Sequence, residues 1–146
     1  MSRKIIFPNY IPLMRFLKLE TQFVAIMGHD HKGRGMLLSE YNTRCVQKGE
    51  VHELVLLKKE ENGNVNFEDA WYLGFVAFKK SGVIAKGMTI SIDGKEIGTL
   101  IGFDTTHEPN HYNLLVSTSN PVTGLELGLS LEDNCIFSMK EKNGDN

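Results

Sequence analysis

The sequence predicts an all-β protein, a single small β-barrel that is closed or partly open, with short connections between its strands. Three observations predict this class. Short apolar segments recur along the 146-residue chain, fourteen glycines punctuate it, and no long amphipathic helix interrupts the pattern. The length suits one domain. We divide the chain into an N-terminal arm at residues 1–12, the barrel at residues 13–139 and a disordered tail at residues 140–146.

Most of the expected strands are short apolar or β-branched runs bounded by turn residues. The strongest turn signal is EENGN at residues 60–64, because Asn62-Gly63 favours the positive φ angles of a tight hairpin. Apart from the hairpin described next, the expected strands are residues 21–27, 36–38, 51–59, 65–67, 71–78, 112–118, 125–131 and 135–139.

The clearest alternation runs through residues 88–92, where every second residue is apolar, as a half-buried strand requires. Asp93-Gly94 supplies a two-residue turn, and residues 96–103 form the returning strand. Residues 87–103 (GMTISIDGKEIGTLIGF) resemble the entry hairpin of an uncharacterised family of small bacterial β-barrel domains. The resemblance implies the barrel fold and no particular activity.

Charge and composition exclude several classes of function. Sixteen Lys+Arg against eighteen Asp+Glu give a formal net charge of -2, which argues against a nucleic-acid-binding surface. The cysteines, Cys45 and Cys135, form neither a CxxC metal clip nor a disulfide framework. No apolar run approaches the roughly 18–20 residues of a membrane helix, and the interrupted N-terminal apolar stretch lacks the form of a signal peptide. We therefore expect a soluble, cytoplasmic protein without membrane contact.

Four of the five histidines fall in two short polar loops, each after an expected strand end. In the second loop, Pro109 opposes a helix, and Glu-Pro-Asn-His fits a β-turn with Pro109 at its second position and Asn110 at its third. Such a turn gathers imidazole and carboxylate groups at one edge of the barrel, which are the ligands of zinc, manganese or iron. The candidate metal ligands here are Asp104, His107, Glu108 and His111.

The first loop is the glycine-rich segment at residues 28–35. His29 and His31 point to the same side if the strand continues, and they complete the candidate metal ligands. Lys32 and Arg34 lie among glycines whose amides can approach an anion, so this loop can hold a phosphate or a carboxylate. The alternative is a solvated hairpin connection without a ligand.

Two functions remain open. The first is a small-molecule or metal-binding barrel whose site combines the two histidine loops, with a divalent metal that activates water or holds an anionic ligand. Whether it catalyses a reaction is left open. The second is a noncatalytic interaction or regulatory module, in which the apolar N-terminal arm packs on a neighbouring subunit of a homo-oligomer. The fifth histidine, His52, is interpreted as an exposed strand position.

Overall fold

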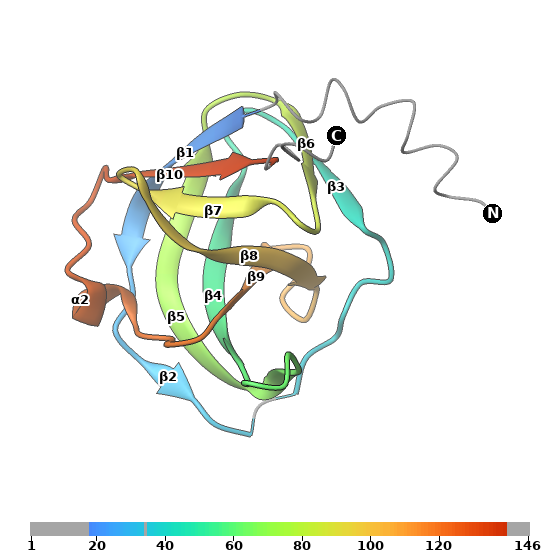
Figure 1. The fold of residues 1–146 in the computed structure, drawn as a ribbon. Helices are drawn as coiled ribbons and strands as arrows, with labels where there is room; N and C mark the ends of the chain where they lie inside the picture. Colours follow the sequence, from blue (N-terminus) through green and yellow to red (C-terminus); the bar gives the residue numbers. More distant parts are fainter. Residues whose placement is uncertain (1–17, 34, 140–146) are drawn as a thin grey trace, which may run out of the picture.

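A computed structural model describes residues 18–33 and 35–139, and within them the chain forms ten strands and one short helix (Figure 1). The predicted N-terminal arm at residues 1–12 and the predicted tail at residues 140–146 lie outside the described residues. The elements are β1 (Lys18–Ile26), β2 (Asp30–His31), β3 (Thr43–Val46), β4 (Val51–Lys59), β5 (Val65–Phe78), β6 (Gly82–Ala85), β7 (Thr89–Ile92), β8 (Lys95–Asp104), β9 (Asn113–Thr118), α2 (Gly124–Leu127) and β10 (Asn134–Ser138).

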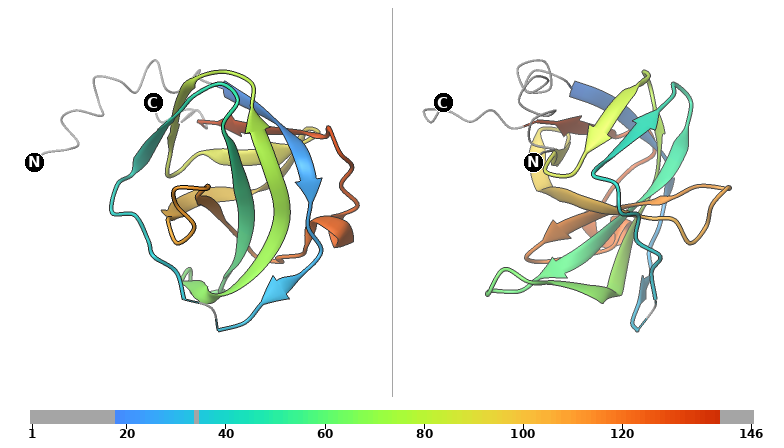
Figure 2. Two further views of the ribbon diagram at one scale, coloured as in Figure 1. Left: turned by 180° about the vertical axis from the view of Figure 1, so that it is seen from behind. Right: turned by 90° about the vertical axis from the view of Figure 1, so that its right-hand side faces the viewer.

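Seven strands close into a barrel (Figures 1 and 2). The order around the ring is β1-β10-β7-β8-β9-β4-β5, and β5 pairs with β1 to close it. A ring with an odd number of strands cannot alternate direction throughout. Here β4 and β9 are parallel, and the other six neighbouring pairs are antiparallel. β2 adds to β5 outside the ring, and β3 pairs with β6 as a separate two-stranded sheet. The predicted β-barrel is confirmed in its closed form.

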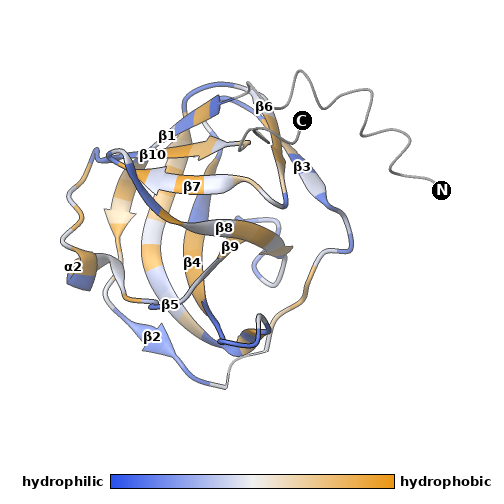
Figure 3. Cartoon of the chain, in the orientation of Figure 1, coloured by the Kyte–Doolittle hydropathy of each residue, from blue (hydrophilic) through white to orange (hydrophobic). Residues whose placement is uncertain are grey.

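Apolar side chains from alternate strand positions fill the barrel, and a second apolar cluster lies on its outer wall. On β4, Leu54 and Leu56 belong to the interior cluster, while Val55 and Leu57 belong to the outer one. Met36, from the segment that follows β2, packs on the outer cluster. Because this wall is covered on both sides, the middle of β4 is apolar without alternation. Figure 3 shows the contrast between the apolar barrel strands and the hydrophilic β4–β5 turn and β2.

β5 is a single strand of fourteen residues that joins the two segments predicted at 65–67 and 71–78. It pairs with both β4 and β1, and each pairing has a register shift close to Gly74. Gly74 has a φ of 153°, and a Cβ there would lie 2.1 Å from the backbone oxygen of Ala25. Only glycine fits this close approach of two strands.

The predicted hairpin at residues 87–103 is confirmed. Ile92 pairs with Lys95, so that Asp93 and Gly94 form the two-residue loop, with φ angles of 51° and 84°. Positive φ at both positions is the signature of a turn whose twist matches the flanking strands.

Two predicted strands are wrong. Residues 125–131 contain no strand, and their first part belongs to helix α2, because Thr123 and Glu126 form a reciprocal capping box at the helix start. Residues 36–38 are not a strand either, since only Leu38 makes an isolated bridge, to Asp104. Within the described part of the chain, no helix combines the length and the apolar character that crossing a membrane requires.

Candidate functional site

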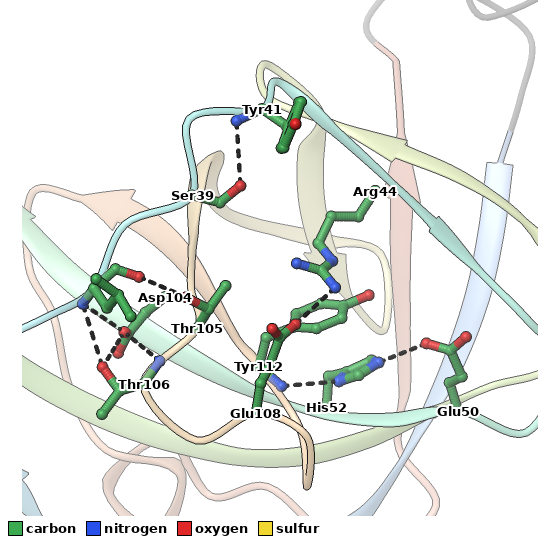
Figure 4. Close-up of polar contacts among 11 residues, drawn as sticks. Ser39, Tyr41, Arg44, Glu50, His52, Asp104, Thr105, Thr106, Glu108 and Tyr112 are labelled. Atoms are coloured by element: carbon green, nitrogen blue, oxygen red, sulfur yellow. Dashed lines mark hydrogen bonds and ion pairs between the residues drawn. The ribbon is translucent and has the colours of Figure 1, made fainter.

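The polar side chains with the closest contacts gather at one mouth of the barrel (Figure 4). β4 and β9 run parallel with Glu53 opposite Asn113, so the residues just before them, His52 and Tyr112, lie next to each other. β3 brings Arg44 over this pair. Glu50, before β4, and Glu108, in the loop between β8 and β9, supply a carboxylate on either side. That loop projects from the barrel wall in Figure 2.

His52 is buried, with 6% of its surface exposed, so its interpretation as an exposed strand position is wrong. Its Nδ1 accepts a hydrogen bond of 3.2 Å from the backbone N–H of Tyr112, and its Nε2 lies 2.7 Å from Glu50 Oε1. Because Nδ1 is an acceptor, the proton must sit on Nε2 and is donated to Glu50. Burial lowers the pKa of His52 below 6.5. The imidazole is therefore held neutral in one tautomer.

Tyr112 lies in the centre of a stack of three planar groups. Its ring is 3.5 Å from that of His52, with 18° between their planes, and the guanidinium carbon of Arg44 lies 4.0 Å from the ring centre. Arg44 also donates a hydrogen bond of 2.7 Å from one terminal nitrogen to Glu108 Oε2. This guanidinium therefore has a fixed orientation, set by a ring below it and a carboxylate beside it.

A cavity of about 370 Å³ opens at this mouth. Its wall combines a guanidinium, two carboxylates, two imidazoles and a phenol. The lining residues are Arg44, Glu50, His52, Glu108, Pro109, His111 and Tyr112.

Two buried polar atoms on the cavity residues have no hydrogen-bond partner in the protein: Tyr112 Oη and His111 Nε2. Burial raises the pKa of Tyr112, which keeps the phenol protonated as a hydrogen-bond donor. Buried polar groups in folded proteins nearly always have partners, so each unpaired atom indicates a place for a water or a ligand.

His111 occupies the side of the cavity next to the β8–β9 loop. Its Nδ1 lies 2.7 Å from Asn110 Oδ1, and its ring stacks on His107 at 5.2 Å. Its Nε2 lies 3.7 Å from Glu53 Oε1, which is too far for a hydrogen bond. Burial, and then the nearby His107, lower the pKa of His111.

The turn in this loop differs from the prediction by one residue. His107 O accepts from the N–H groups of Asn110 and His111, at 3.0 and 3.3 Å. Pro109 therefore stands at the third position of the turn rather than the second, and its peptide bond with Glu108 is cis. The turn directs Glu108 towards Arg44.

Asp104 makes hydrogen bonds that join two segments of the chain. It is fully buried, and its Oδ1 accepts hydrogen bonds from the backbone N–H of Leu37 and from both the N–H and the hydroxyl of Thr106. These bonds attach the segment before β3 to the start of the β8–β9 loop (Figure 4). The carboxylate thereby positions the loop that carries Glu108.

The first histidine loop makes different contacts. His29 is exposed and stacks on Tyr72 at 4.4 Å, His31 pairs with Ala70 in β2, and Lys32 is exposed. Arg34, the other candidate anion-binding residue, lies outside the described residues. Across residues 18–33 and 35–139, no three His, Cys, Asp or Glu side chains form a group that could hold a metal ion. Metal binding by the two histidine pairs stays a prediction.

The candidates predicted from the sequence did not include four of the residues at the mouth, which are Arg44, Glu50, His52 and Tyr112. One signal was present. His52 has the same alternate spacing as the interior residues Leu54 and Leu56, which places it on the core face of β4. A histidine on a core face is a candidate for a specific polar role.

The comparisons with known proteins identify a family without assigning an activity. Residues 15–138 match a family of unknown function (DUF6917). Neither the curated proteins nor the solved structures contain a match to the chain. Because the matched region spans most of the sequence and all of the barrel, the chain belongs to the DUF6917 family.

Proposed function

We propose that the protein binds a small polar molecule in the cavity at the barrel mouth. The observation that carries this proposal is the Tyr112 hydroxyl. It is buried, it belongs to a residue that lines the cavity, and its O–H has no acceptor in the protein. A ligand group that accepts its hydrogen bond recovers the energy of an unpaired buried donor, about 1–3 kcal/mol.

The size and rigidity of the cavity support the same proposal. Its volume of about 370 Å³ falls within the range of small-molecule sites. Its walls are held in place before any ligand arrives, since His52 is bonded at both nitrogens and Glu50 accepts from His52 and from the backbone N–H of Gln47. Preorganised groups lose little entropy on binding, which favours affinity.

A larger hollow, of about 840 Å³, lies near the β4–β5 turn. It is lined by lysine, glutamate, asparagine and serine residues around Lys58 and Ser119, without an aromatic side chain. Lys58 already donates to the backbone oxygen of Ser119 at 2.7 Å. Flexible charged side chains with no aromatic wall are a poor site for a small molecule, so we prefer the mouth.

NMR of the ¹⁵N-labelled full chain tests the proposal. A mixed set of neutral, anionic and cationic fragments is added, and the backbone amide shifts are followed. We expect the shifts to concentrate at residues 44, 50–52, 108 and 110–112. Shifts concentrated at residues 58–62 and 119–120, or no shifts at all, would contradict the proposal.

A second candidate function is assembly into a homo-oligomer. Three side chains within residues 37–41, on the segment before β3, are apolar or aromatic and strongly exposed: Leu37 at 63%, Leu38 at 48% and Tyr41 at 68%. Grouped exposed apolar residues are typical of protein interfaces. Light scattering on the full chain and on the L37S/L38S variant tests this. We expect an oligomer that dissociates in the variant, and a monomeric full chain would refute it.

A cytoplasmic location belongs to the same set of proposals. Cys45 and Cys135 are both free thiols, which suits a reducing compartment. Fractionation of the cells that make the protein tests this, with the protein expected in the cytosolic fraction and not in a secreted or membrane fraction.

A further inference from the structure

We propose that the ligand of the mouth cavity carries a carboxylate, which binds Arg44 and the hydroxyl of Tyr112 and displaces Glu108. This inference rests on the proposed function, because it names the chemistry of a molecule bound at that same site. When no ligand is bound, the Glu108 carboxylate takes the position beside Arg44 that the ligand carboxylate would occupy.

The orientation of Arg44 is the first argument. A guanidinium presents five N–H donors in a planar fork that matches the two oxygens of a carboxylate. The contact of 2.7 Å with Glu108 uses one terminal nitrogen, and the Tyr112 ring holds the plane of the group at 4.0 Å. The protein thus presents an oriented cation on the wall of the cavity, and a carboxylate is the group that it already binds.

The Tyr112 hydroxyl is the second argument. It is a buried donor without an acceptor, on a residue that lines the same cavity as Arg44. Two neighbouring side chains are engaged, His52 at both nitrogens and Glu50 through both of its oxygens, while the unpaired His111 Nε2 belongs to the side of the cavity next to the β8–β9 loop. The Tyr112 hydroxyl therefore lacks an acceptor. An anionic acceptor on the ligand would also suit the adjacent Arg44 guanidinium.

Glu108 can give way at low cost. Its side chain is 38% exposed and that of Arg44 is 28% exposed, so the pair lies at the edge of the cavity and Glu108 can turn into water. Ion pairs of this exposure contribute little to stability. A ligand that uses both Arg44 and the buried Tyr112 hydroxyl therefore gains one contact that Glu108 does not make.

The test compares sodium propionate with propionamide, its neutral isostere, and with sodium phosphate, at constant ionic strength. Binding to the full chain is measured from amide shifts at residues 44 and 112. We expect propionate to bind more tightly than propionamide and phosphate. In E108Q and E108A, which remove the internal carboxylate, propionate affinity should rise by about three- to tenfold.

R44M is the matched variant, because methionine keeps an apolar stem against Tyr112 without the charge. Propionate binding should fall by about tenfold or more in R44M, while propionamide binding changes little. Unchanged propionate binding in R44M, weaker binding in both Glu108 variants, or stronger binding of phosphate than of propionate overturns the inference. If propionamide shifts the amide signals of the mouth residues and propionate does not, the carboxylate inference fails, and the cavity remains a ligand site with different chemistry. If neither of these two fragments nor any member of the wider fragment set shifts those amide signals, the proposed function fails as well.

Discussion

Replacing His52 by leucine removes the hydrogen bonds and the ring stack that build the barrel mouth. His52 is 6% exposed, stacks on Tyr112 at 3.5 Å and accepts the backbone N–H of Tyr112 at 3.2 Å. Leucine has a similar size and retains the apolar contact with the barrel interior. It has no acceptor for the Tyr112 N–H and no planar ring for the stack.

The expected cost follows from those two losses. Leaving the buried N–H of Tyr112 without an acceptor costs about 1–3 kcal/mol. Loss of the ring stack costs about 0.5–1.5 kcal/mol. Glu50 loses a donor as well, but its side chain is 32% exposed and can be solvated instead. H52L should therefore lower the free energy of unfolding by about 2–4 kcal/mol.

Urea denaturation measures this cost, with the fluorescence of Trp71, the single tryptophan, as the signal. A loss of this size lowers the midpoint by about 1–2 M urea. H52N is the matched control, because its Oδ1 can take the place of Nδ1 and accept from Tyr112. We expect H52N to be more stable than H52L by about 1 kcal/mol or more. Equal stability of H52L and the parent, or of H52L and H52N, would refute the hydrogen-bond account of the mouth.

Three further predictions concern other parts of the molecule. Burial lowers the pKa of His52 in the folded chain, so the unfolded chain binds more protons below pH 6.5, and the free energy of unfolding should fall as the pH drops from 7.5 towards 5. G74A places a Cβ 2.1 Å from Ala25 O at a positive φ and should cost about 2–4 kcal/mol in urea denaturation. Burial raises the pKa of the Cys135 thiol to about 12, whereas Cys45 is exposed, so a disulfide reagent should titrate one thiol per native chain and two after denaturation.

Each of these predictions has a control. H52N should reduce the pH dependence of stability, and an identical slope in H52N would show that another group causes it. G35A adds a Cβ with nothing within 4 Å and should change stability by less than about 0.5 kcal/mol. Rapid reaction of both thiols in the native protein would contradict the burial of Cys135.

The local signals in the sequence predict much of the barrel. The bounds predicted for the strand at 51–59 are those of β4, and Asp93-Gly94 forms the predicted hairpin turn. Both are decided by neighbouring residues, through strand propensity and turn chemistry.

Helix α2 was missed because two local signals compete. Leu125, Leu127, Leu129 and Leu131 alternate with polar residues or glycine, which is a strand pattern. The capping box at Thr123 and Glu126 predicts a helix start, and the structure follows the cap. The segment connects β9 to β10 and lies outside the ring, where no strand pairs with it to stabilise a strand conformation.

The mouth site depends on contacts that no local pattern records. His52 and Tyr112 are 60 residues apart, and they meet because β4 and β9 are parallel neighbours in a seven-stranded ring. The sequence identifies Glu108 and His111 as polar loop residues, but it does not reveal that Glu108 pairs with Arg44 of β3 or that His111 lies near Glu53 of β4. Strand order decides the site, and strand order is a property of the whole fold.

The most direct measurement is a crystal structure of the full chain soaked with propionate and with a set of neutral fragments. The account predicts density for one of these molecules in the cavity of about 370 Å³, with an oxygen within hydrogen-bond distance of Tyr112 Oη. Ordered water alone in that cavity, with the same fragments bound elsewhere on the barrel, would contradict it.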